Sequence, residues 1–202
     1  MKALIFDMGG VVLLPGGSRR LREEISARFK IPLEALNSAW NKSFGLWECG
    51  KITERDFLNR LNRDLGNKLD LNAVKLTILN EQKLNNDLLP VIKELQSQYL
   101  LLALTNHARE WFEPSKLKYS LGRIFSRIYT SYELGVQKPD PRIYNILLRE
   151  EKLNPDDCLF IDDYDANVAA ARDLGMRAIK FTGVNELVSE LKLAGINVNL
   201  SR

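Results

Sequence analysis

Residues that could handle a phosphoryl group stand where apolar runs of the chain end. They are Asp7 after "ALIF", Thr105 and Asn106 after "YLLLAL", Lys138 in "GVQKPDP", and Asp162 and Asp163 after "CLFI". Buried parallel strands are apolar almost throughout, and ligands of such sheets bind outside the carboxyl ends of the strands. We therefore expect these side chains to share one crevice.

The residue types in this set indicate a particular chemistry. Converging carboxylates repel one another and raise each other's pKa unless a cation lies among them. Oxygen ligands with few nitrogens or sulfurs suit Mg²⁺, and a lysine is a compact positive charge for a phosphoryl group. A hydroxyl and an amide can bind the remaining phosphoryl oxygens. The set therefore predicts phosphoryl transfer to an aspartate nucleophile.

These residues need a sheet to position them, and the chain contains five short apolar runs that read as strands. The runs are "ALIF" (3–6), "YLLLAL" (99–104), "RIY" (127–129), "CLFI" (158–161) and "AIKF" (178–181). Helical segments lie between most of them; one opens with Asp140 and Pro141, an N-cap followed by proline at the first helical position. Alternating strands and helices predict an α/β fold with a doubly wound parallel sheet.

One connection is far longer than a crossover requires. About ninety residues separate the first two runs, and they contain amphipathic segments at about 18–30, 33–42, 53–65 and 71–80 but no convincing strand. We expect residues 15–85 to form an inserted helical cap over the strand ends. Residues 1–14 and 86–202 would then form the core domain.

Composition narrows the class of protein. A net charge of +3 in 202 residues, with basic residues interspersed among acidic ones, gives no indication of nucleic-acid binding. Cys49 and Cys158 lack metal-ligand spacing and are expected to be free thiols. We see neither a signal peptide nor a run long enough to cross a bilayer, and expect a cytoplasmic protein without membrane attachment, a monomer or a homodimer.

Four motifs along the chain resemble those of the haloacid dehalogenase superfamily of phosphohydrolases. They are "FDMGGVV", "LTN", "KPDPRIY" and "FIDDYDANVAAARDLGM", of which the last is long and specific. Within the superfamily the chain is most similar to bacterial sugar-phosphate phosphatases and to the phosphatase domain of soluble epoxide hydrolase. The resemblance implies a Rossmann-like three-layer sandwich with an inserted helical cap. It also implies a Mg²⁺-dependent hydrolase acting on a small phosphorylated metabolite.

The resemblance assigns a role to each matching residue. Asp7 would be the nucleophile that forms an aspartyl-phosphate, and Lys138 would neutralise both nucleophile and phosphate. Thr105 and Asn106 would bind phosphate. Asp163 would bind Mg²⁺ directly, and Asp162 would lie beside it in or next to the coordination sphere.

Gly9 departs from the family pattern, which usually has a second aspartate two residues after the nucleophile. In the family that aspartate binds the metal through its backbone carbonyl, and its carboxyl protonates the leaving group. Gly9 keeps the carbonyl and loses an acid–base group typically worth about 10²–10⁴ in rate. Without any acid, acyl and aryl phosphates would be hydrolysed far better than alkyl phosphates.

Three interpretations remain open at this stage. The first is a phosphatase whose acid is water or another residue, with His107 considered but expected to be solvent-exposed or a cap. The second is a catalytically impaired protein with a binding or regulatory role. The third is a dehalogenase, which needs neither metal nor second aspartate but would have no use for Asp162 and Asp163 together.

The predicted cap offers few pointers to substrate. Trp40 and Phe44, spaced i and i+4, are expected in the core of the cap. The segment 44–53 is expected to be an inter-helix turn facing the site, where Trp47, Glu48 or Lys51 could touch substrate. The segment 109–119, with Trp111, could pack on the cap or on a partner.

Overall fold

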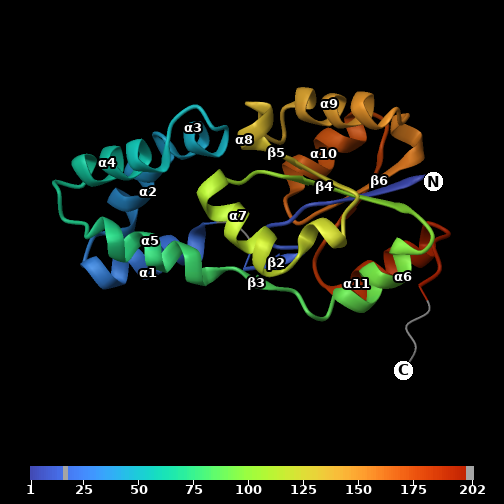
Figure 1. Ribbon diagram of the computed structural model, residues 1–202, viewed down its shortest axis with the longest axis horizontal. Coiled ribbons are helices and arrows are strands. Elements are labelled where there is room, and N and C mark those ends of the chain that lie inside the picture. The colour runs from blue at the N-terminus through green and yellow to red at the C-terminus, as the bar shows by residue number, and fades with distance from the viewer. Residues whose placement is uncertain (16–17, 199–202) are drawn as a thin grey trace.

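A five-stranded parallel sheet forms the centre of the protein (Figure 1). The computed structural model describes residues 1–15 and 18–198, apart from the side chains of 79–81. The strand order is β5-β4-β1-β6-β7. The strands are β1 (Ala3–Phe6), β4 (Leu100–Thr105), β5 (Arg127–Thr130), β6 (Cys158–Asp162) and β7 (Arg177–Lys180). All five predicted strands are confirmed, and their ends agree with the prediction to within one residue.

Both faces of the sheet are buried because the strand side chains alternate between two separate cores. In β1, Leu4 and Phe6 belong to one core, and Ala3 and Ile5 to the other. The first core also includes residues of α6 (Leu89–Gln96) and α11 (Val184–Leu193), and the second includes residues of α9 (Pro141–Glu151) and α10 (Asp165–Asp173). Figure 1 shows these two helix pairs above and below the sheet, which makes the expected three layers.

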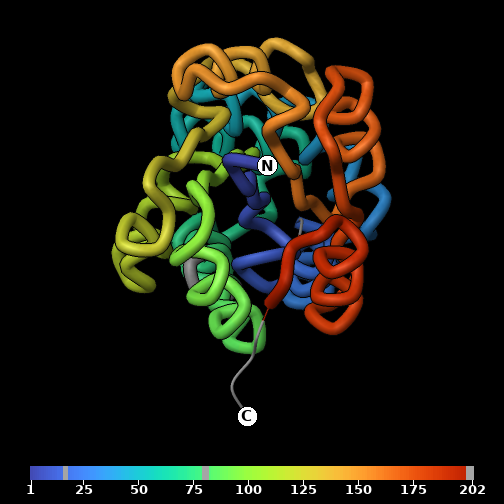
Figure 2. Tube along the Cα trace, turned by 90° about the vertical axis from the view of Figure 1, so that its right-hand side faces the viewer, coloured from blue at the N-terminus to red at the C-terminus, as the bar shows by residue number. Residues whose placement is uncertain are grey.

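Asp140 caps α9 as its position before Pro141 predicts, since its side chain accepts a hydrogen bond from Arg142 N. The remaining elements of this part are α7 (Arg109–Lys118), α8 (Ser131–Leu134) and the 3₁₀ turns η1 (Leu121–Arg123) and η2 (Pro155–Asp157). Viewed from the side, the start of the chain lies near the middle of the molecule (Figure 2), as the central position of β1 requires.

In the described part of the chain, residues 18–81 of the long connection between β1 and β4 fold into five helices with a core of their own. They are α1 (Arg19–Phe29), α2 (Leu33–Asn41), α3 (Phe44–Glu48), α4 (Glu54–Asp64) and α5 (Leu71–Glu81). Trp40 lies in this core and its ring centroid is 5.2 Å from that of Phe44, as predicted. Ala108 and Trp111 of the sheet domain belong to the same cluster, so the 109–119 segment packs on the helices of the insertion.

Two expectations about the insertion are wrong. Residues 44–48, expected in a turn, form the helix α3, whose Trp47 stacks on Phe57 at 4.6 Å between ring centroids. The stretch also contains a strand, since β3 (Lys83–Leu84) pairs antiparallel with β2 (Leu13–Leu14) where the chain leaves and re-enters the sheet domain.

The boundaries at 15–85 stay a prediction. Residues 16–17 of the insertion and 199–202 of the core domain lie outside the described residues. Among the described residues, no helix combines the length and apolarity needed to cross a bilayer. Cys49 and Cys158 are both buried free thiols, as expected.

Candidate active site

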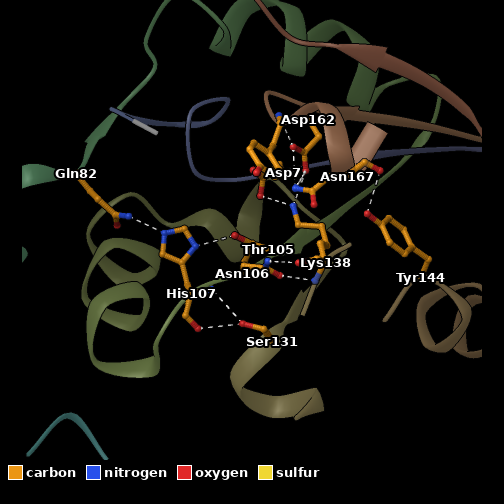
Figure 3. Close-up of polar contacts among 11 residues, drawn as sticks. Asp7, Gln82, Thr105, Asn106, His107, Ser131, Lys138, Tyr144, Asp162 and Asn167 are labelled. Atoms are coloured by element: carbon orange, nitrogen blue, oxygen red, sulfur yellow. Dashed lines mark hydrogen bonds and ion pairs between the residues drawn. The ribbon is translucent and has the colours of Figure 1, made fainter. Parts of the chain in front are cut away.

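The strand order explains why the predicted residues meet. β1 lies between β4 and β6, so the chain positions after these three neighbouring strands open onto the same crevice. Asp7 extends the β1 ladder, because its backbone N–H donates to Ile161 O at 2.8 Å. Figure 3 shows Asp7, Thr105 and Asp162 gathered around Lys138.

Lys138 joins two of the carboxylates. Its Nζ lies 2.7 Å from Asp7 Oδ1 and 2.6 Å from Asp162 Oδ2, and its side chain is only 1% exposed. Burial would lower the pKa of Lys138, but the carboxylates of Asp7 and Asp162 more than offset this, and its pKa is raised. The site therefore contains a fixed positive charge beside Asp7.

The side chain of Asn106 positions Lys138 rather than pointing free into the crevice. Its Oδ1 accepts from Lys138 N at 2.8 Å and its Nδ2 donates to Lys138 O at 2.8 Å. This reciprocal pair holds the backbone of Lys138 against the end of β4. The role of Asn106 in phosphate binding stays a prediction. The hydrogen bonds of its side chain to the Lys138 backbone were not predicted.

Asp162 is saturated with hydrogen bonds. Its Oδ1 accepts from Tyr164 N at 2.8 Å, and its Oδ2 accepts from Lys138 Nζ and from Asn167 Nδ2 at 3.0 Å. The side chain is 0% exposed. Asp162 is thus mainly occupied in holding Lys138, whereas Asp163 is only partly buried and lines the cavity.

The donor set fits a hard cation. One carboxylate oxygen each from Asp7, Asp162 and Asp163 lie within 4.8 Å of one another. Burial raises the pKa of Asp7 and of Asp163, and although Lys138 lowers both, Asp162 raises them further. Asn167 lines this cavity, and its Oδ1 is a buried acceptor with no partner among the described residues. A divalent cation with its water would relieve both the repulsion and the unpaired oxygen.

Gly10 is required by the closeness of Asp163. Its φ is +83°, and a Cβ there would lie 2.0 Å from Asp163 Oδ2. Any side chain at this position would displace the Asp163 carboxylate from the cluster. The second glycine of "MGGVV" is therefore explained by the packing of the site.

His107 is buried, at 6% exposure, and the expectation of an exposed or capping residue is wrong. Gln82 Oε1 accepts from Ser115 Oγ at 3.0 Å, so its amide nitrogen donates to His107 Nε2 at 2.7 Å. His107 Nδ1 then carries the proton and donates to Thr105 Oγ1 at 2.7 Å. Burial, together with the charge of Lys138, lowers the pKa of His107 to about 3, so the ring is neutral near pH 7.

This arrangement argues against His107 as a surrogate acid. Its Nε2 has no proton to give, and its Nδ1 proton is directed at the buried hydroxyl of Thr105. With its oxygen accepting from His107, the Thr105 hydroxyl still has its own proton to donate. Thr105 is 0% exposed and does not line the cavity, so its role in phosphate binding stays a prediction. His107 and Gln82 therefore orient Thr105, a role that the sequence gave no reason to expect.

A cavity of about 320 Å³ adjoins these residues and is closed in part by the helical insertion. Glu48 and Phe44 of α3 line it together with Asp7 and Lys138. Trp47 is instead packed in the core of the insertion, and Lys51 lines a different hollow. Of the three residues considered for substrate contact, only Glu48 faces this cavity.

Asn167 and Gln82 were missed by sequence reasoning. Asn167 lies five residues after Asp162, which brings the first turn of α10 back to the end of β6. That spacing within "DDYDAN" was a usable signal. Gln82 had none, because it reaches His107 only through the tertiary pairing of β2 with β3.

Comparison with known proteins extends these observations. A protein-family model for haloacid dehalogenase-like hydrolases matches residues 1–175. Bifunctional epoxide hydrolase 2 of Sus scrofa is 25% identical over 226 residues, and the match covers 98% of this chain and 40% of that protein. The chain therefore spans well under half the length of this relative.

A second relative and a solved structure have nearly the same extent as this chain. D-ribitol-5-phosphate phosphatase of Bacteroides thetaiotaomicron is 25% identical over 192 residues, covering 89% of this chain and 91% of that protein. A crystal structure of a HAD family enzyme from the same organism, in complex with magnesium and inorganic phosphate, superposes with a TM-score of 0.75. It is 21% identical and covers 89% of this chain and 93% of that one, which shows a common fold.

Proposed function

The chain belongs to the haloacid dehalogenase-like hydrolase family, and we propose that it is a Mg²⁺-dependent phosphatase that hydrolyses small phosphomonoesters through an aspartyl-phosphate on Asp7. The observation that carries the proposal is the position of Lys138 Nζ, 2.7 Å from Asp7 Oδ1. A buried carboxylate paired with a fixed cation is held in place for attack on an anionic phosphoryl group.

The residues around Asp7 have complementary tasks in this reaction. Lys138 balances the charge of the phosphoryl group, and Thr105 donates its hydroxyl proton to one of the phosphoryl oxygens. Asp7, Asp163 and the backbone carbonyl of Gly9 would hold Mg²⁺, with Asp162 next to them. When bound, the ion would polarise the phosphoryl group and neutralise the carboxylates.

The size and charge of the surroundings favour a small anionic substrate. A cavity of about 320 Å³ accommodates a metabolite but not a polymer. An adjoining hollow shares Pro15 and Asp163 with it, and among the described residues its lining also includes Arg20, Arg28 and Lys83 together with the acid Glu24. A rim on which positive side chains outnumber negative ones attracts phosphates.

A phosphate-release assay tests the proposal. Purified protein is incubated with acetyl phosphate, p-nitrophenyl phosphate and a set of pentose and hexose phosphates, with Mg²⁺ or with a chelator. We expect turnover only with Mg²⁺, and Asp7→Asn should lower it by more than about 10³-fold because the nucleophile is lost. An Asp7→Asn variant as active as the wild type would contradict the aspartyl-phosphate. Halide release from a 2-haloacid without Mg²⁺ would favour a dehalogenase instead.

A further inference from the structure

The short helix α3 is fastened to the sheet domain at consecutive residues. Trp47 Nε1 donates to Glu110 Oε2 of α7 at 2.9 Å, and Cys49 Sγ donates to Gln137 Oε1 at 3.4 Å. Between them, the backbone oxygen of Glu48 accepts from Ser131 Oγ at 2.6 Å. The backbone that bears Glu48 is thereby fixed relative to the sheet.

The next residue brings the two parts into direct backbone contact. Gly50 has φ +64°, and a Cβ there would lie 2.5 Å from Tyr132 O of α8. Only glycine allows this approach. Four consecutive residues thus determine where the Glu48 side chain points.

The Glu48 carboxyl faces the cavity that contains Asp7. Within the described part of the chain it makes no hydrogen bond and no ion pair, and it does not belong to the carboxylate cluster of Asp7, Asp162 and Asp163. It is partly buried, and its remaining exposure is toward the cavity. A carboxyl held in a cavity without a structural partner is free to act on a ligand.

We propose that Glu48 is the general acid and base of this phosphatase and replaces the carboxyl that is absent at Gly9. The inference rests on the proposed function and extends it. Attacking and leaving oxygens lie roughly in line across a transferred phosphoryl group. Asp7 attacks from the end of β1, so the leaving oxygen points away from the sheet, toward the helical insertion that carries Glu48.

The proton balance of both steps is complete with Glu48. In the first step the Asp7 carboxylate forms a bond to phosphorus, the ester P–O bond breaks, and the Glu48 carboxyl gives its proton to the departing alkoxide. In the second step the Glu48 carboxylate takes a proton from a water molecule, whose oxygen attacks phosphorus. The bond between Asp7 and phosphorus breaks, and the Asp7 carboxylate, inorganic phosphate and protonated Glu48 are restored.

The electrostatic surroundings agree with this role. Burial and the negative charge of Asp7 raise the pKa of Glu48 to about 8, while Lys138 opposes the shift. Among the described residues, the other charged or titratable groups that line the cavity are Asp163, Tyr164 and His107, and His107 is neutral near pH 7. A carboxyl with this pKa is protonated in the resting protein and can still lose its proton during turnover.

The test compares substrates that need an acid with substrates that do not. We expect Glu48→Gln to lower kcat/KM for a sugar phosphate by about 10²–10⁴-fold and to change kcat/KM for acetyl phosphate and p-nitrophenyl phosphate by less than about tenfold. Glu34→Gln is the matched control, since it makes the same charge change at an exposed residue of α2 in the insertion, outside the cavity and outside the contacts that fasten α3, and it should leave kcat/KM unchanged for both substrate classes.

A rescue experiment separates catalysis from folding. Gly9→Asp in the Glu48→Gln background restores an acid from the sheet domain and should recover sugar-phosphate turnover selectively. Should Glu48→Gln unfold, Glu48→Asp replaces it: it keeps the carboxyl but shortens its reach, and it is expected to lower kcat/KM for a sugar phosphate more than kcat/KM for acetyl phosphate. Equal losses on alkyl and aryl phosphates in Glu48→Gln would overturn the role of Glu48. No turnover by the wild type on any substrate would overturn the phosphatase assignment itself, and Glu48's role with it.

Discussion

The acid–base carboxyl that is absent at Gly9 is, in our proposal, supplied by Glu48, which is distant in the sequence. The sequence identified the loss at Gly9, because the missing carboxyl stands beside a recognisable nucleophile. It named Glu48 only as one of three residues that could touch substrate and gave no reason to regard it as the acid, since its position beside the cavity depends on contacts of α3 with Ser131 and Gln137. The residues at strand ends were predictable because strand order alone brings them together. The position of Glu48 was not predictable in this way, because Glu48 reaches the site from the helical insertion.

The same distinction applies to His107. Its position two residues after Thr105 indicated closeness to the site, but not whether it is buried, charged or exposed. Those properties come from Gln82 and Phe112, which enclose the ring. The structure thus replaces a candidate acid with a residue that orients Thr105.

The residue-scale prediction is that His107→Gln lowers turnover of alkyl and aryl phosphates by the same factor, roughly tenfold to a hundredfold. A misplaced Thr105 hydroxyl weakens binding of the phosphoryl group whatever the leaving group is, by about the 1.5–3 kcal/mol of a hydrogen bond to a charged group. Steady-state kinetics on both substrate classes check this. A loss confined to alkyl phosphates would instead identify His107 as an acid.

At the scale of elements, predictability follows from where the stabilising contacts lie in the sequence. Strands such as Leu100–Thr105 are continuous apolar runs because both faces are covered, so local composition reveals them. The helix α3 has only five residues and depends on Trp47 stacking between Phe57 at 4.6 Å and Trp111 at 5.6 Å. Its partners come from two other helices, which sequence patterns do not pair.

The element-scale prediction concerns the attachment of α3. Gly50→Ala introduces a Cβ into Tyr132 O at a left-handed residue, so α3 must move and carry Glu48 away from Asp7. We expect sugar-phosphate turnover to fall by at least about tenfold, with aryl phosphates affected less because they need little protonation. Gly122→Ala is the control, since a Cβ there meets nothing within 4 Å. Unchanged alkyl turnover in Gly50→Ala would show that α3 does not have to remain in this position.

At the scale of the molecule, a shared hydrophobic cluster unites the insertion and the sheet domain. Trp111 of α7 packs among the aromatic residues of the insertion, and its Nε1 donates to Ile78 O of α5 at 2.9 Å. The site between the two parts therefore gathers several carboxyl groups that burial keeps from ionising freely. Ionising these buried carboxyl groups should therefore lower the free energy of unfolding of the whole protein.

The sign of this effect follows from proton linkage. Asp7, Asp163 and Glu48 have raised pKa values in the folded protein, with that of Glu48 at about 8, so the folded state holds protons that the unfolded state has lost. Stability contributed by these groups therefore falls as pH rises from the ordinary carboxyl range to about 8. His107 acts oppositely, but only below the ordinary histidine pKa, and the raised pKa of Lys138 matters only at higher pH. From pH 7 to 8.5 the carboxylates act first; the raised pKa values of the buried thiols Cys49 and Cys158 add a loss of the same sign near the upper end of this window, which Glu48→Gln leaves unchanged.

The whole-molecule prediction is that thermal stability without a divalent cation falls between pH 7 and 8.5, and that Mg²⁺ stabilises the protein more at pH 8.5 than at pH 7. A bound cation makes the ionised carboxylates favourable, and a ligand at 100 times its Kd adds roughly 2.7 kcal/mol, which is several degrees in Tm for a chain of this size. Differential scanning fluorimetry with Mg²⁺ or a chelator measures both effects. Asp163→Asn should abolish the Mg²⁺ shift, whereas Glu48→Gln should retain it and reduce only the pH dependence measured without metal. A Mg²⁺ shift without phosphate release from any substrate would favour the catalytically impaired, regulatory interpretation, because the binding of the cation would then have survived the loss of the chemistry.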